Sequence, residues 1–94
     1  MQTEASQQII KRFFEALYHI KGLGLIRGKQ TFTAKFGINR WNFNSLEKDM
    51  SRDIFQSAWL TYLVEKYGVS AKWLLTGQGN IMAKQKKSRA EVEK

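Results

Sequence analysis

The side chains best suited to contacting another molecule are concentrated in residues 28–47 of this sequence. The outward face of a predicted helix in this stretch carries Arg40, Trp41, Asn42, Asn44 and Ser45. Arginine and asparagine can each form two parallel hydrogen bonds to a base edge, and asparagine and serine also bind phosphate oxygens. No acidic residue lies in the stretch before Glu47. This face therefore favours contact with base edges and phosphates over plain exposure to solvent.

The same stretch has the spacing of a helix-turn-helix, with two short helical segments joined by a turn at residues 36–39. Phe32 and Phe36 lie four residues apart, on one face of the first segment. Gly37 can adopt positive φ where the chain turns, and Asn39 can cap the second segment. The residues of this unit expected to face inward after the turn are Ile38, Phe43 and Leu46.

A longer helix is expected before this unit, from about residue 3 or 6 to residue 21. Apolar residues repeat every four positions along it and give it a broad apolar face. Gly22 and Gly24 are expected to end this helix. The loop that follows is expected to be pinned onto the core by Leu23, Leu25 and Ile26.

Two further helices are expected after the unit. Asp53 followed by Gln56 resembles a capping box that opens the first of them, and Gly68 ends it. Ser70 can cap a last short helix at residues 71–75. The residues of this last helix expected to be buried are Trp73, Leu74 and Leu75, and those expected to fold back onto the core after it are Ile81 and Met82.

Length and composition predict one small domain, residues 1–82, followed by a disordered or frayed basic tail, residues 83–94. A hydrophobic share of 43% is sufficient for a compact core at 94 residues. The absence of cysteine excludes disulfides and thiolate metal sites, and the single histidine, His19, cannot form an imidazole site by itself. No apolar run approaches the length of a membrane span, so we expect a cytoplasmic protein with no membrane contact.

The net charge of +8 is unevenly distributed along the chain. Residues 16–46 contain no acid, and their basic residues are Lys21, Arg27, Lys29, Lys35 and Arg40. The rest of the excess lies in the tail. Because the basic excess coincides with the helix-turn-helix pattern, a polyanionic partner is expected.

Two sequence segments resemble a known family. Residues 67–81, YGVSAKWLLTGQGNI, resemble the closing signature of the lambda-repressor-like, phage-repressor-type helix-turn-helix class. Residues 36–40, FGINR, together with Leu46 and Glu47, resemble the turn and recognition helix of the same class. The resemblance implies an all-α domain of five helices, in which a recognition helix at about residues 39–48 enters the major groove of double-stranded DNA. It also implies a homodimer on a two-fold site, although the sequence itself leaves dimerisation open because no clean heptad is present.

The resemblance implies a set of DNA contacts, position by position. The base-reading candidates are Arg40, Trp41, Asn44 and Ser45. The phosphate-binding candidates are Arg27, Lys29, Gln30, Lys35, Asn42 and Lys48. For Trp41 three alternatives stay open, namely contact with a thymine methyl, contact with a sugar, and packing on the protein itself. Thr33 and the long connection with Gly22 and Gly24 depart from the class, so the angle between the two helices can differ.

We therefore expect a sequence-specific transcriptional regulator of repressor type, bacterial or phage, that has no catalytic activity, cofactor or small-molecule ligand. Catalysis is not expected because the sequence offers no paired acid and base, no metal-ligand cluster and no nucleophile with a partner. The alternative is a helix-turn-helix protein-interaction module without sequence-specific DNA reading, with Trp41 and Phe43 as its hydrophobic anchors.

Overall fold

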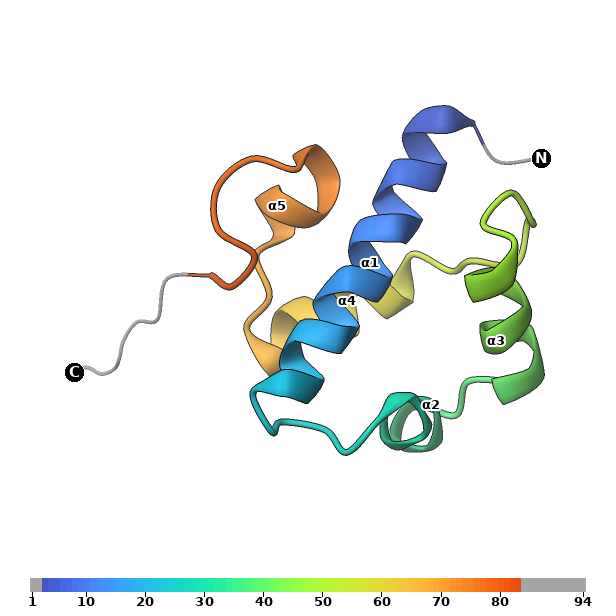
Figure 1. The fold of residues 1–94 in the computed structure, drawn as a ribbon, viewed down its shortest axis with the longest axis horizontal. Helices are drawn as coiled ribbons and strands as arrows, with labels where there is room; N and C mark the ends of the chain where they lie inside the picture. Colours follow the sequence, from blue (N-terminus) through green and yellow to red (C-terminus); the bar gives the residue numbers. More distant parts are fainter. Residues whose placement is uncertain (1–2, 84–94) are drawn as a thin grey trace.

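The computed structural model describes residues 3–83, and within them the chain is all-helical apart from one isolated bridge between Val69 and Met82 (Figure 1). The helices are α1 (Glu4–Gly22), α2 (Lys29–Phe36), α3 (Arg40–Lys48), α4 (Ala58–Tyr67) and α5 (Ala71–Thr76). The expected all-α domain of five helices is thus confirmed. The predicted basic tail lies, from residue 84 onward, outside the described residues.

Helix α1 is the central element of the fold, with α5 on one side and α2 and α3 on the other (Figure 1). Thr3 caps its first turn by accepting a hydrogen bond from the Ser6 amide at 3.1 Å. The apolar stripe predicted from the sequence is buried, and its buried residues are Ile10, Phe13, Phe14, Ala16, Leu17 and Ile20. The observed limits, Glu4–Gly22, agree to within a residue with the predicted start at residue 3 and end at residue 21, and the alternative start at residue 6 is wrong.

Aromatic side chains from four elements meet around Phe13 of α1. Its ring centroid lies 5.8 Å from that of Phe32 in α2, 5.9 Å from Phe43 in α3 and 5.9 Å from Trp59 in α4. Phe55, in the loop before α4, lies 5.4 Å from the same ring. Aromatic pairs at these distances add to the stabilisation from burial itself. The cluster therefore fixes α2 and α3 onto α1.

Helix α5 is held at both ends by side chains. Ser70 accepts a hydrogen bond from the Trp73 amide at 3.2 Å, as predicted for the cap. Arg12 of α1 donates from Nε to the Leu74 carbonyl at 2.8 Å and from Nη2 to the Leu75 carbonyl at 3.1 Å. These carbonyls lie in the last turn of α5, where carbonyls lack partners within the helix. Arg12 lies outside the buried apolar stripe of α1, and the sequence alone does not indicate this role.

The segment after α5 returns to the core, as predicted. The Ser70 amide donates to the Ile81 carbonyl at 2.9 Å, and the Ala83 amide donates to the Gly68 carbonyl at 2.8 Å. Ile81 and Met82 are half-buried and pack against the core.

Three predictions about the scaffold were wrong. Helix α4 begins at Ala58, not at the predicted capping box of Asp53 and Gln56, and its N-cap Ser57 makes no side-chain capping bond. In the loop after α1, Ile26 is buried as predicted, but its expected companions Leu23 and Leu25 are exposed. In α5, Leu74 is buried and Trp73 is half-buried, whereas Leu75 is exposed.

The difference at α4 has a physical reason. The half-buried Phe55 packs its ring against Phe13 at 5.4 Å and against Trp59 at 5.3 Å, and residues 49–57 form turns and irregular backbone along the edge of the core. Burial of an aromatic ring outweighs a capping box, whose contribution is about 1 kcal/mol.

Candidate nucleic-acid interface

The turn between α2 and α3 has the geometry that the sequence predicted. Gly37 ends α2 with φ of 66°, in the left-handed region that favours glycine. The amides of Gly37 and Ile38 both donate to the Thr33 carbonyl, the latter at 2.9 Å. Asn39 caps α3 by accepting a hydrogen bond from the Asn42 amide at 3.0 Å. The direction in which α3 leaves the turn is therefore set by local hydrogen bonds.

Two fully buried side chains, Phe43 and Leu46, fix which face of α3 points outward. Thr33 is also buried, and its hydroxyl donates to the Gln30 carbonyl at 3.2 Å. The hydroxyl group of Thr33, the residue noted above as a departure from the resembled class, therefore has a hydrogen-bond partner inside α2. Because Phe43 is fully buried, it cannot act as a surface anchor.

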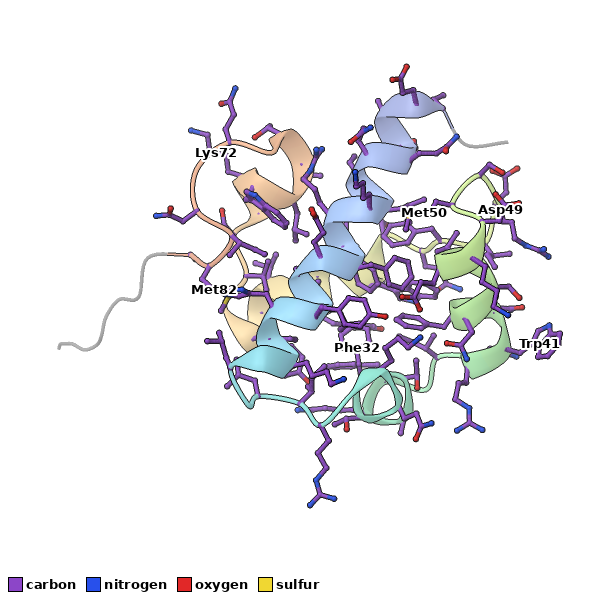
Figure 2. All side chains as sticks on the ribbon, viewed as in Figure 1. Phe32, Trp41, Asp49, Met50, Lys72 and Met82 are labelled. Carbon is purple, nitrogen blue, oxygen red and sulfur yellow. The ribbon has the colours of Figure 1, made fainter. Side chains whose placement is uncertain are left out.

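The outward face of α3 carries the predicted base-reading residues. Arg40 and Trp41 are exposed, whereas Asn44 and Ser45 are half-buried. Within residues 3–83, no hydrogen bond or ion pair engages any of these four side chains. Trp41 projects away from the body of the protein (Figure 2) and is 78% exposed, so the alternative that it packs on the protein is wrong.

One ion pair ties the start of α2 to the end of α3. Lys29 Nζ lies 2.5 Å from Glu47 Oε1, and the Tyr18 hydroxyl of α1 donates to the other carboxylate oxygen. Burial tends to raise the pKa of Glu47, but the hydrogen bonds from Lys29 and Tyr18 and the lysine charge outweigh it, so this pKa is below its ordinary value. The hydrogen bond to Glu47 raises the pKa of Lys29 and that of Tyr18. Around neutral pH the cluster is therefore an ionised, hydrogen-bonded clamp.

The clamp was missed in the sequence because its members are distant along the chain. Tyr18 and Glu47 are 29 residues apart, and each resembles an ordinary surface residue of an amphipathic helix. The signal that was available is that Glu47 is the first acid after a long acid-free stretch.

The predicted phosphate-binding residues fall into separate groups. An open hollow at the start of α2 brings together Arg27, Lys29 and Gln30. A second hollow, beneath the α2–α3 turn, is lined by Asn42 together with Gln56 of the loop before α4. Arg27 and Gln30 are exposed, whereas Lys29 is already paired with Glu47.

The two remaining phosphate-binding candidates lie at helix ends. Lys48 is exposed in the last turn of α3. Lys35 lies over aromatic rings, with Nζ 5.7 Å from the centroid of Phe36 and 5.6 Å from that of Tyr67. Lys48 therefore extends the outward face of α3, whereas Lys35 packs on the rings of α2 and α4.

Comparisons with protein-family models, with curated proteins and with solved structures find no match for this chain. Within residues 3–83 no group of three or more histidine or acidic side chains could hold a metal ion. In the same part of the chain, no helix has the length and apolarity needed to cross a membrane.

Proposed function

We propose that the protein is a sequence-specific regulator of transcription that binds double-stranded DNA, with α3 as the helix that enters the major groove. The observation that carries this proposal is the outward face of α3. There a free arginine, an exposed indole and two amide side chains stand on a helix whose other face is anchored in the core. The turn before α3, with Gly37 at positive φ and Asn39 as the cap, supports the proposal, because in a helix-turn-helix the N-terminal residues of the second helix contact base edges.

Electrostatics support DNA as the partner. From residue 16 to residue 46 the chain carries five basic residues and no acid. The first acid that follows, Glu47, is neutralised by its contact with Lys29. Arg27, Arg40 and Lys48 remain exposed around α2 and α3, so a phosphate backbone would meet no unpaired carboxylate from this segment.

Each side chain has a distinct task in this arrangement. Arg40 can donate two parallel hydrogen bonds to guanine, and Asn44 can bond adenine in the same way, each contributing about 1–3 kcal/mol of discrimination. Ser45 can bond a base edge from the following position of the helix. Arg27 and Lys48 bind phosphates on either side, which sets the position of α3 without reading sequence.

In this proposal the protein is a repressor of the lambda-repressor-like, phage-repressor-type class and has no catalytic activity. It acts in the cytoplasm of a bacterium or in a phage. We further propose that two copies bind a two-fold site. A hollow lined by Leu60, Val64 and Leu75 lies on α4 and α5, and α5 is on the opposite side of α1 from α3 (Figure 1). An apolar surface there could join two copies while leaving α3 free.

The alternative, a protein-interaction module that does not read DNA, is favoured by one observation and weakened by another. The exposure of Trp41 would suit a hydrophobic anchor, but the second proposed anchor, Phe43, is fully buried. Salt-insensitive capture of a protein partner, without duplex binding, would favour this alternative over DNA binding.

Selection of bound duplexes from a random pool tests the proposal. We expect a defined consensus, palindromic if two copies bind, and an affinity that falls steeply with added salt. Recovery of random sequence, or affinity that does not change with salt, would rule out sequence-specific DNA reading.

A matched pair of variants then separates base reading from phosphate binding. Arg40→Ala should relax the base preference at one step and weaken the free energy of binding to the consensus duplex by about 1–3 kcal/mol. Arg27→Ala removes the same charge from an exposed loop position. It should weaken binding to all duplexes alike and reduce the slope of log affinity against log salt concentration by about one. Arg27 is the better control because Lys29 also holds α2 to α3.

A further inference from the structure

Trp41 has the largest exposed fraction among the large hydrophobic side chains of the described residues, at 78%. Trp59, by contrast, is buried in the aromatic core, and Trp73 is half-buried in α5. Within residues 3–83, Trp41 makes no ring contact, cation–π contact or side-chain hydrogen bond. The fold therefore does not account for an indole at this position.

The position of Trp41 determines what it can touch. It is the second residue of α3, directly after Arg40 and three positions before Asn44, which lies one turn further along the same helix. A helix that enters the major groove by its N-terminal end places these positions nearest the base edges. Trp41 and Arg40 would then face neighbouring base steps.

The chemistry of the indole selects among the groups in the groove. Its only polar group is one N–H donor, and the rest of its surface is apolar. The major-groove edges of the bases carry hydrogen-bond donors and acceptors, and the C5-methyl of thymine is the apolar group among them. Indole carbon placed on donors or acceptors would strip water from them without replacing its hydrogen bonds, whereas a methyl group loses nothing by that contact.

We propose that Trp41 makes the protein select duplexes with a C5-methylated pyrimidine, thymine or 5-methylcytosine, at the step beside the base read by Arg40. This inference rests on the proposed function, because it requires α3 to lie in the major groove. The two pyrimidines present the same methyl group at the same place in the groove, so the shared chemistry is the methyl itself.

Deoxyuridine substitution isolates that methyl. Deoxyuridine pairs with adenine as thymine does and differs in the groove only by the missing C5-methyl. Each thymine of the selected consensus duplex is replaced in turn, and affinity is measured for the wild-type protein, Trp41→Ala and Trp41→Phe. The wild type should lose about fourfold in affinity for each contacted methyl. Trp41→Ala should be indifferent to the replacement, and Trp41→Phe should keep part of the effect.

The outcomes separate this inference from the proposed function. Wild-type affinity that is unchanged by every deoxyuridine overturns the inference while DNA reading stands. A deoxyuridine effect of full size in Trp41→Ala also overturns it, since another residue would then contact the methyl. Failure to select any duplex consensus overturns the proposed function and the inference together.

A second substitution distinguishes the two methylated pyrimidines. At the sensitive position the thymine is exchanged for cytosine and then for 5-methylcytosine, each paired with guanine. A gain in wild-type affinity from cytosine to 5-methylcytosine, lost in Trp41→Ala, supports recognition of the methyl in either base. No gain overturns the 5-methylcytosine part and restricts Trp41 to thymine.

Discussion

Replacing Arg12 by alanine tests whether one side chain of α1 secures the closing helix of the domain. The guanidinium donates to the carbonyls of Leu74 and Leu75, at 2.8 Å and 3.1 Å. It also lies against Gly77, where an added Cβ would come within 3.3 Å of Nη1. The glycine at the end of α5, with φ of 78°, thus leaves room for the arginine that caps the helix.

The expected cost follows from these two bonds. A hydrogen bond that involves a charged group contributes about 1.5–3 kcal/mol to the free energy of unfolding. The bond to Leu74 is partly buried, whereas the bond to Leu75 is exposed and contributes little. We therefore expect Arg12→Ala to lower the free energy of unfolding by about 2 kcal/mol. For a domain of this size that is a fall of about 8–16 °C in Tm.

Thermal and urea unfolding, followed by circular dichroism, measures this cost. Lys11→Ala is the matched control, because Lys11 is an exposed neighbour on the same helix and should change stability by less than about 0.5 kcal/mol. Arg12→Lys keeps the charge but loses the planar fork, so it should be intermediate. Equal stability of Arg12→Ala and Lys11→Ala would refute the capping role.

Two further predictions concern the unit that carries α3. Because the folded pKa of Glu47 is lowered, its contribution to stability is present above the ordinary carboxyl pKa and is lost as pH falls through the folded pKa. Urea unfolding should therefore show Glu47→Gln less stable than wild type near neutral pH, with the difference closing as pH falls below the ordinary carboxyl pKa and through the lowered folded one; a gap that persists in strong acid would contradict this. Gly37→Ala should lower the free energy of unfolding by about 1–2 kcal/mol, because alanine is strained at φ of 66°. It should also weaken duplex binding. Gly28→Ala, at the extended N-cap of α2 with open space around it, should lower stability less than Gly37→Ala in thermal unfolding, and equal costs would show that backbone strain at Gly37 is not the cause.

The features predicted well from the sequence are those that depend on near neighbours. The apolar stripe of α1, the glycine that ends α2 and the cap at Asn39 each involve residues within one or two helical turns. Periodicity and capping act over that range, so these features can be predicted from the sequence alone.

The features that were missed depend on contacts between distant segments. Leu75 has the same local context as Leu74, but α5 packs on α1 through Leu74 and leaves Leu75 in solvent. Arg12 resembles a surface residue until α5 places two carbonyls beside it, 62 and 63 residues away in sequence. A linear pattern contains no information on such pairings, because they arise only when the helices pack.

The candidate site divides α3 into residues that hold it and residues that are free. Phe43 and Leu46 are fully buried, and Glu47 is clamped, so these three fix the helix on the core. Arg40 and Trp41 contribute nothing to the core, since both are exposed. Substitutions at the exposed positions should therefore change which duplex is bound at almost no cost in stability. Substitutions at the buried positions should unfold the domain before they alter its preference.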